Sequence, residues 1–375
     1  MPLPEVHLVG GTSTEAARLV PVAAAMRDQG RLAPILVAAG PDPLAFTRAL
    51  AVFGRTPGLA VPVDSGDTDA VLIGRLDRLW ATRTPAAVMV QGDGGGSLPA
   101  AIAAYWRRIP VVHLDAGRRS SELGSSTVAE ANRRLLAQVA TVHLAAVPLD
   151  AMNLLDERIA GGDVLLTGNT SADAALAMAG RPRLPYTDPA LAELRATGTN
   201  RLLVVAVERA GSVVGELVRA AVRRLVASYP DLDVVMLGAD LPEGSRRIAG
   251  IGLSDYADRA RVLAEAYLIL TDDADLHEEA LAFGVPALVF CELTDRMESM
   301  VAGCARLVGT SPEAIVSAVA NLLDSRVRRD AMTAAGNPYG DGLAARRAAQ
   351  ATAALLGHGP FPDPMPVRQV AGLSR

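Results

Sequence analysis

The sequence is poor in cysteine, has no long apolar run and carries no surplus of positive charge. Its two cysteines, Cys291 and Cys304, lie far from any CxxC spacing, so we expect reduced core residues rather than a disulfide or a metal site. No apolar run approaches the roughly 18 residues that a membrane span needs. The N-terminus lacks the basic start and apolar core of a signal peptide. These absences predict a cytoplasmic protein that does not bind a membrane.

The charge and the length set two further bounds. The net charge is −5, with both signs dispersed along the chain, so there is no basic stripe of the kind that nucleic acid requires. A chain of 375 residues exceeds what one hydrophobic core usually supports, which favours two domains. Half of the residues are apolar, which is enough to form two cores.

Residues 88–117 contain the clearest local pattern. An apolar run leads into Gln91-Gly92-Asp93, a glycine-rich turn and a helix-like stretch follow, and a second apolar run ends at Asp115. This order of elements is typical of a βαβ unit. Ligands of open α/β sheets bind at the carboxyl ends of the strands. We therefore expect Asp93 and Asp115 to face one crevice, where they are the candidate catalytic residues.

The N-terminal segment predicts an anion-binding turn. A short strand at residues 6–9 leads through Gly10-Gly11-Thr12-Ser13 into a helix at residues 15–27. Free backbone N–H groups and the helix dipole point outward together at such a helix start. Many α/β proteins begin in this way, so the pattern by itself is weak.

Strand and helix patterns alternate through the rest of the chain, which predicts an α/β fold with parallel sheets. We expect further strands at residues 33–39, 142–146, 164–166, 201–207, 232–237, 267–271 and 286–290. We expect further helices at residues 69–83, 128–140, 212–229, 276–283 and 344–356. The first domain should span residues 1–181 and the second residues 201–343, joined by a proline-containing connection. Residues 357–375, with a proline at every second position from Pro360 to Pro366, should be disordered.

Several of these stretches resemble motifs of the non-hydrolysing UDP-N-acetylglucosamine 2-epimerases. The similar motifs are Gly11-Thr12-Ser13-Thr14-Glu15, Gln91-Gly92-Asp93, Thr167-Gly168-Asn169-Thr170 and Asn337-Pro338-Tyr339-Gly340. The resemblance runs from about Val6 to Leu356 and implies the GT-B architecture, with two Rossmann-like domains facing each other across a cleft. It also implies that residues 344–356 cross back to the first domain.

The family resemblance also implies a chemistry and a set of partners. Members eliminate UDP from a UDP-sugar and add it back on the other face, without redox chemistry, so no cofactor is expected. The implied ligand is a small-molecule sugar or nucleotide sugar. The chain should form a homodimer or associate with a related epimerase.

By the same resemblance, Asp93 corresponds to the first acid of the family, while Asp115 takes the place of a glutamate one methylene longer. The glutamate that the family uses in Pro-Glu-Glu-x-Asn-Arg is Ala129 here. Glu130 matches the second glutamate, and we expect it to cap its helix or form an ion pair. The family histidine is replaced by Val207. We expect the other histidines of the first domain and tail, His7, His113, His143 and His358, to be structural.

The implied substrate-binding residues fall in both domains. In the first domain they are Gly11, Ser13, Glu15, Arg18 and Asn169, where Ser13 replaces an arginine and Arg18 replaces a lysine. In the second domain they are Asp273, Asp275, Glu279 and Arg296. Glu279 matches the acid that holds the ribose hydroxyls, and Arg259 takes the approximate place of the aromatic residue that faces uracil.

The diphosphate loop of the family, Thr-Asp-Ser-Gly-Gly, is Thr271-Asp272-Asp273-Ala274-Asp275 here. Two carboxylates at this place should repel a diphosphate by about 3–4 kcal/mol each at roughly 4–5 Å. In one interpretation Asp273 and Asp275 cap their own helix and fill the anion site with protein. In the other, the site receives a cation, such as an amine-bearing sugar or a metal. His277 has no recognised ligand spacing, so no metal residue is predicted.

Three functional hypotheses follow. The first is a divergent epimerase-like enzyme that acts on an altered sugar or nucleotide-sugar substrate through Asp93 and Asp115. The second is a catalytically silent homologue that serves as a partner or regulatory subunit. The third is a hydrolase or transferase of the GT-B class.

Overall fold

The computed structural model describes residues 2–40, 42–62, 69–119, 127–180, 186–196, 198, 200–207, 212–238, 246–252, 256–291, 294 and 296–367. These residues form two compact units. The first contains the described residues up to Ala174 together with those from Tyr339 onward, and the second runs from Ala175 to Pro338. The expected boundaries at residues 181 and 343 thus lie several residues beyond the divisions between the units.

The first unit is built on a seven-stranded parallel sheet. Its strands are β1 (Glu5–Gly10), β2 (Ala33–Ala38), β3 (Leu59–Ala60), β4 (Ala87–Gln91), β5 (Val111–Leu114), β6 (Val142–Ala145) and β7 (Val164–Leu166). The strand order is β3-β2-β1-β4-β5-β6-β7, so the winding direction reverses between β1 and β4. Ligand sites of doubly wound sheets lie outside the carboxyl ends of the strands at this reversal.

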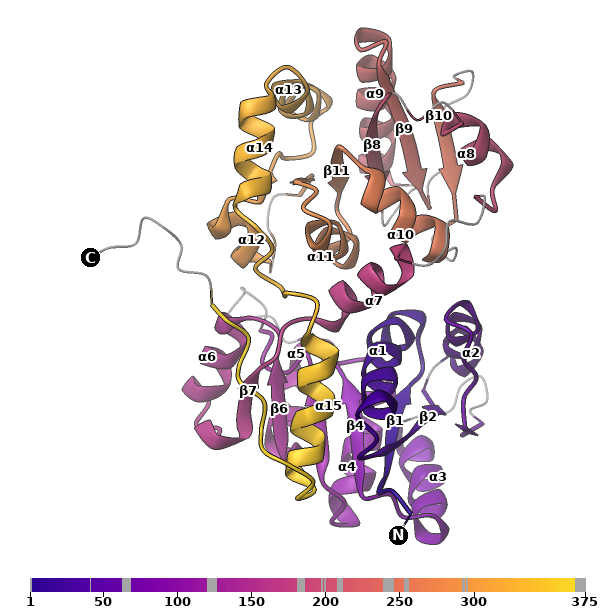
Figure 1. Ribbon diagram of the computed structural model, residues 1–375, viewed down its shortest axis with the longest axis vertical. Coiled ribbons are helices and arrows are strands. Elements are labelled where there is room, and N and C mark those ends of the chain that lie inside the picture. Colours follow the sequence, from indigo (N-terminus) through magenta and orange to yellow (C-terminus); the bar gives the residue numbers. More distant parts are fainter. Residues whose placement is uncertain are drawn as a thin grey trace, which may run out of the picture. The chain divides into compact units, whose positions relative to one another are not determined.

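Helices cover both faces of this sheet (Figure 1). They are α1 (Ser13–Gln29), α2 (Pro43–Val52), α3 (Asp69–Thr82), α4 (Ser97–Trp106), α5 (Val128–Val139), α6 (Pro148–Asp156) and α15 (Ala344–Leu355). The 3-10 turn η1 (Gly161–Asp163) precedes β7, and helix α7 (Thr170–Ala179) contains the division between the two units. The apolar stripe of α3 is core, since Leu72, Leu76 and Trp80 pack with β1, β4 and α4 in one buried cluster. Helix α15 packs against α1, so the last helix of the chain completes the unit that the first strand begins.

The second unit repeats this plan with a six-stranded parallel sheet of order β10-β9-β8-β11-β12-β13. Its strands are β8 (Arg201–Ala206), β9 (Leu232–Leu237), β10 (Ile248–Ile251), β11 (Leu268–Thr271), β12 (Ala287–Val289) and β13 (Ala305–Leu307). Its helices are α8 (Pro189–Leu194), α9 (Val213–Ser228), α10 (Tyr256–Glu265), α11 (Ala274–Ala282), α12 (Met297–Ala302), α13 (Pro312–Leu323) and α14 (Arg326–Ala334). Here the reversal of winding lies between β8 and β11.

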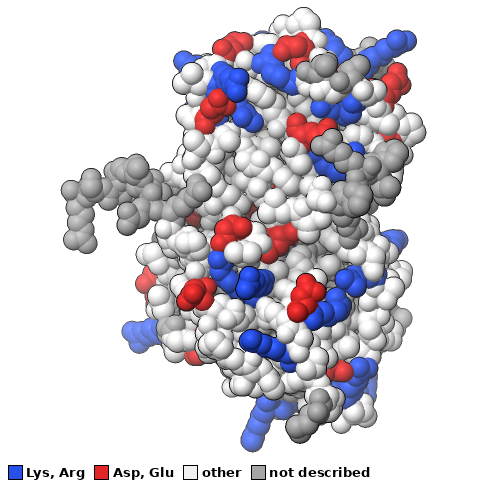
Figure 2. All heavy atoms as spheres, in the orientation of Figure 1, with Lys and Arg blue, Asp and Glu red and all other residues white. Residues whose placement is uncertain are grey.

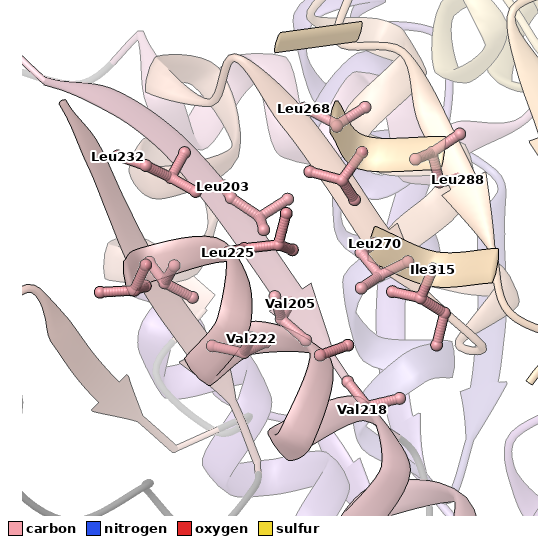
Figure 3. Close-up of a cluster of buried hydrophobic side chains, with 14 of the residues drawn as sticks. Leu203, Val205, Val218, Val222, Leu225, Leu232, Leu268, Leu270, Leu288 and Ile315 are labelled. Carbon is pink, nitrogen blue, oxygen red and sulfur yellow. The ribbon is translucent and has the colours of Figure 1, made fainter. Parts of the chain in front are cut away.

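The core of the second unit forms between its sheet and the helices α9 and α13. Figure 3 shows Leu203 and Val205 of β8 pointing toward Val222 and Leu225 of α9, with Ile315 of α13 beside Leu270. These strands are apolar at successive positions because both faces of a parallel sheet are covered by helices. The continuous apolar runs in the sequence therefore correspond to strands that are buried on both faces.

The described chain after α15 is mostly exposed, but it is attached to the first unit at Met365. The backbone N–H of Met365 donates to the carbonyl of Leu166 at the end of β7 (2.7 Å), and the side chain of Met365 is buried. This differs from the disorder expected for residues 357–367, because the alternate prolines permit an extended strap that makes few ladder bonds. Residues 368–375 of the predicted tail lie outside the described residues.

Every cationic side chain of the chain is an arginine, since its 36 Lys and Arg residues include no lysine. Figure 2 shows acidic and basic atoms interspersed among uncharged ones on the face in view, without a large area of a single sign. Within the described residues, no helix combines the length and apolarity needed to cross a membrane.

Candidate functional site

The start of α1 is locked by a reciprocal cap at the reversal point of the first sheet. The Thr12 hydroxyl accepts the backbone N–H of Glu15 (3.2 Å), and Oε2 of Glu15 accepts the backbone N–H of Gly11 (2.7 Å) and the Thr12 hydroxyl (2.9 Å). This is a capping box. Glu15 and Gly11, two of the predicted substrate-binding residues, are thus bonded to each other. Ser13, a third, is exposed on the first turn of α1.

Glu15 also joins this loop to the glycine-rich turn after β4. Ser97 Oγ lies 3.2 Å from Glu15 Oε1, and a Cβ at Gly94 would lie only 2.3 Å from the same oxygen. Glycine at position 94 is therefore what allows the carboxyl group to enter the turn. Burial raises the pKa of Glu15, although its hydrogen bonds from Gly11, Thr12 and Ser97 oppose that shift.

Asp115 sits directly after β5 in a buried ion pair. Its Oδ2 accepts a hydrogen bond from the Arg18 guanidinium and one from the Gln91 side-chain amide, the latter at 2.6 Å. All three residues are at most 5% exposed. The backbone of Asp115 is left-handed, with φ of 58°, a conformation that aspartate tolerates better than most residues.

The surroundings of Asp115 favour its ionised form. Burial alone would raise the pKa of its carboxyl group, but the positive charges of Arg18 and Arg118 and the hydrogen bond from Gln91 outweigh burial and lower it. A carboxylate with this environment is a fixed negative charge at neutral pH.

Asp93 follows β4 and is more accessible than Asp115. Its Oδ2 lies 2.8 Å from Arg133 Nε, and 28% of the Asp93 side chain is exposed. Arg133 belongs to α5, where Glu130 also lies 3.6 Å from Arg133 and 2.9 Å from Arg134. The backbone N–H of Glu130 donates to the Thr127 cap. The expectation that Glu130 would cap or salt-bridge is confirmed.

His113 of β5 contacts the loop that carries Asp93 and interacts electrostatically with both Asp93 and Asp115. Its Nε2 lies 2.8 Å from the carbonyl oxygen of Gly92, the residue before Asp93. Burial lowers the pKa of His113 to about 4, so the ring is neutral at physiological pH. His143, its register partner on β6, is also buried with a pKa lowered to about 4.

Asn169 follows β7 and serves the backbone of its own unit. Its Oδ1 accepts the N–H of Ser171 (2.9 Å), and its N–H donates to the carbonyl of Tyr339 (2.7 Å). The side chain is completely buried. Asn169 therefore fixes the start of α7 to the returning chain, and its predicted contact with substrate stays a prediction.

In the second unit, Asp273 caps α11 at the reversal point between β8 and β11. Its Oδ1 accepts the N–H groups of Asp275 (2.8 Å) and Leu276 (3.1 Å), while the Thr271 hydroxyl accepts the N–H of Asp273 (2.9 Å). Burial raises the pKa of Asp273, and the charge of Asp275 adds to that shift. The interpretation in which the acidic residues cap their own helix thus holds for Asp273. Its Oδ1 accepts backbone N–H groups that could otherwise donate to an anion.

Next to this cap, Glu279 lies in a buried cluster with Arg259 and Tyr256. Arg259 donates to both carboxyl oxygens of Glu279 (3.0 and 3.2 Å), and the Tyr256 hydroxyl donates to Oε1 (3.1 Å). The guanidinium of Arg259 also lies 4.3 Å from the centre of the Tyr256 ring. Burial raises the pKa of Glu279 to about 7, with Arg259 opposing and Asp275 adding to the shift.

We expect Glu279→Gln to weaken the pH dependence of the stability of the second unit. Because the folded-state pKa of about 7 exceeds the ordinary value of 4.5, the contribution of Glu279 is complete below about pH 4.5 and is lost as the pH rises through about 7. Urea midpoints at about pH 5 and about pH 8 measure this slope, with the exposed Glu313→Gln as the matched control. An unchanged slope in Glu279→Gln contradicts the prediction.

Arg296, at the start of α12, forms a buried ion pair with Glu278 of α11. Its Nε lies 2.5 Å from Glu278 Oε1, which joins the start of α12 to α11. Residues 208–211 after β8 and Asp295 beside Arg296 lie outside the described residues. Within the described residues, no three His, Cys, Asp or Glu side chains are grouped so that they could hold a metal ion.

The structure thus brings the predicted residues together in two groups. Gly11, Glu15, Arg18 and Asp115 meet at the switch point of the first sheet, and Asp273, Asp275 and Glu279 interact at that of the second. Sequence reasoning did not assign roles to several residues that contact the predicted site residues within each unit. Those residues are Thr12, Gln91, Ser97, Arg133 and Tyr256. Only the capping-box spacing of Thr12 and Glu15 could have been found in advance.

The chain is similar to known proteins along most of its length. The family model of the UDP-N-acetylglucosamine 2-epimerases matches residues 63–353. The UDP-N-acetylglucosamine 2-epimerase of Escherichia coli is 31% identical over 370 residues, covering 92% of this chain and 98% of that protein. The enzyme of Yersinia pestis is 35% identical over 280 residues, covering 70% and 74%. The structure of S. aureus MnaA with UDP has a TM-score of 0.83 at 26% identity, covering 96% of this chain and all of that one.

The predicted fold class is confirmed as α/β, with two Rossmann-like units of the GT-B type. The sequence match extends through both units and includes the glycine-rich turn of the first and the acidic loop of the second. The chain therefore belongs to the UDP-N-acetylglucosamine 2-epimerase family.

Proposed function

We propose that this chain is a divergent epimerase that transfers a proton at a ring carbon of a sugar or nucleotide sugar, with Asp93 and Asp115 as its acidic residues. The substrate of this chain differs from UDP-N-acetylglucosamine on the nucleotide side. The observation that carries the proposal is the placement of Asp93 and Asp115 after the adjacent strands β4 and β5, both within electrostatic range of His113.

The environments of the two acids suit different tasks. Asp115 is buried and held by Arg18 and Gln91, whereas Asp93 is partly exposed and paired with Arg133. Two carboxylates with different surroundings can divide the work of accepting and stabilising charge. The geometry therefore supports acid–base chemistry on the first unit, with no redox cofactor in the scheme.

The second unit supports the altered substrate. Asp273 occupies backbone donors at the start of α11, and Glu279 is already bonded by Arg259 and Tyr256. The family resemblance assigns ribose and diphosphate to these positions. A nucleoside diphosphate would have to compete with these internal partners and approach two added carboxylates.

Wild-type protein is expected to exchange the C2 proton of at least one sugar nucleotide with deuterium in heavy water, and Asp93→Asn to slow that exchange about a hundredfold or more. The loss follows because epimerisation needs a proton-transfer group on each face of the ring carbon, and the amide cannot serve as the second such group beside Asp115. The measurement is proton NMR of UDP-N-acetylglucosamine, UDP-N-acetylmannosamine and related sugar nucleotides during incubation.

Asp77→Asn is the matched control, since Asp77 is a partly exposed acid of the same unit that pairs with Arg107 as Asp93 pairs with Arg133. This variant should exchange at the wild-type rate. Release of UDP without exchange would instead support a hydrolase or transferase. No exchange with any sugar nucleotide, whatever its base, would exclude the proposed epimerase.

A silent partner subunit is the second candidate, and the residue after β8 favours it. The resemblance places a histidine where this chain has Val207, which is buried and apolar and can neither donate nor accept a proton. Ala129 likewise replaces a carboxylate near the start of α5. Co-purification with an intact epimerase homologue would distinguish this candidate. The homodimer and the cytoplasmic location stay predictions.

A further inference from the structure

Gln91 and Arg18 converge on a single oxygen of Asp115. The side-chain amide of Gln91 donates to Oδ2 at 2.6 Å, and the Arg18 guanidinium donates to the same atom. The other carboxyl oxygen, Oδ1, is hidden from solvent and has no hydrogen-bond partner among the described residues. The two oxygens of this carboxylate are therefore in different environments.

An unpaired buried carboxylate oxygen is costly, because it has lost its water without gaining a donor. Such a group in a folded protein calls for an explanation, and a catalytic role is one of the recognised ones. With its partner oxygen already holding two donors, Oδ1 retains the more available lone pairs. It is the oxygen that can accept a proton or a hydrogen bond from a ligand.

The position of Gln91 follows from the strand register. Gln91 is the last residue of β4 and pairs with Leu114, the residue before Asp115 on β5. Its own carbonyl accepts the Ser97 hydroxyl (2.7 Å), and Ser97 in turn contacts Glu15 (3.2 Å). The amide of Gln91 is thus fixed at its backbone by the glycine-rich turn and at its tip by Asp115.

We propose that Gln91 is a positioning residue that holds Oδ2 of Asp115 and thereby presents Oδ1 to the substrate. This inference rests on the proposed function. In the step, the C–H bond of the substrate breaks and its proton forms an O–H bond with Oδ1. The electron pair of that bond forms a ring double bond as the leaving group departs from the neighbouring carbon with its own bonding pair. The carboxylate becomes a neutral acid and returns the proton in the reverse direction.

Gln91 acts together with the charged groups that face Asp115. These are Arg18 from α1 and Arg118 from the loop after β5, both of which favour the carboxylate. His113 on β5 is neutral above about pH 4 and so adds no charge in the working range. Removing the amide donor therefore leaves the arginines in place and should raise the pKa of Asp115 without abolishing its ionisation.

The test compares wild type with Gln91→Met, which keeps the length of the side chain and removes the donor, and Gln91→Glu, which keeps its shape. Carboxyl-carbon NMR, assigned with Asp115→Asn, follows the titration of Asp115 without any need for activity. We expect its midpoint to rise by about one to two pH units in Gln91→Met. It should rise further in Gln91→Glu, since two adjacent carboxylates share one proton. Gln29→Met, at a half-buried glutamine that donates to the Arg346 carbonyl, is the matched control.

In the exchange assay, we expect Gln91→Met to lower kcat about tenfold to a hundredfold with little change in KM. The acid limb of its pH profile should move with the Asp115 midpoint. An unchanged midpoint overturns the inference, as does a lowered kcat with an unmoved acid limb. If wild type shows no exchange, the proposed function fails, while the NMR titration still decides whether Gln91 controls Asp115.

Discussion

Arg18→Met is expected to destabilise the first unit by about 3–5 kcal/mol, which is the usual cost of leaving one partner of a buried ion pair without its counter-charge. In this variant Asp115 would keep only the amide of Gln91 on Oδ2, with Oδ1 still unbonded. Urea denaturation followed by tryptophan fluorescence measures the change selectively, because both tryptophans, Trp80 and Trp106, belong to the first unit.

Two further variants make the test specific to the buried charge. Arg83→Met breaks a pair with Glu5 whose side chains are 45% and 28% exposed, so it should cost about 1 kcal/mol or less. Arg18→Met combined with Asp115→Asn removes both charges and should recover most of the loss, since asparagine also tolerates a left-handed backbone. Equal destabilisation by Arg18→Met and Arg83→Met would show that the buried charge is not the cause.

Asp273→Ser combined with Asp275→Gly is expected to tighten UDP binding about tenfold or more. Like charges roughly 4–5 Å apart repel by about 3–4 kcal/mol at an effective dielectric near 20, and about 1.4 kcal/mol corresponds to a factor of ten in affinity. Serine also keeps an oxygen that can cap α11, so the helix start should remain formed. Isothermal titration calorimetry with UDP measures the gain.

Asp188→Ser is the matched control for the loss of a capping carboxylate. Asp188 caps α8 in the same unit, where its Oδ1 accepts the N–H of Leu191 (2.9 Å), so its replacement should leave UDP binding unchanged. Because burial raises the pKa of Asp273, UDP should also bind wild type better as the pH falls and that carboxylate is neutralised. Tight UDP binding by wild type, without improvement in the double variant, would remove the electrostatic argument for an altered substrate.

Most of the parallel strands could be predicted because both of their faces are buried. The ranges expected at residues 164–166 and 232–237 coincide with β7 and β9, since an apolar run bounded by polar residues is a strong signal. Strand β3 has only two residues and carries no such run. Helices α12 and α14, of six and nine residues, are too short for the periodicity of apolar positions to identify them.

The sequence predicted where the candidate site residues lie in the fold, but it did not predict which side chains they contact. The order of the strands brings Asp93 and Asp115 to one edge, as the βαβ pattern implied. By contrast, the pairing of Arg18 with Asp115 joins residues 97 positions apart, and that of Arg259 with Glu279 depends on how α10 packs beside α11. No local pattern encodes such pairs, because each depends on the register of elements that meet only in the folded unit.

Helix α15 covers α1, although residues 175–338 of the second unit are encoded between these two helices. On a ribosome that adds about 5–20 residues per second, the second unit can fold from one continuous stretch as soon as it emerges. In the first unit, the side of α1 that α15 covers has to wait about 1–3 seconds more, until α15 has been synthesised. In this family member, the half that is translated first is therefore the half that finishes folding last.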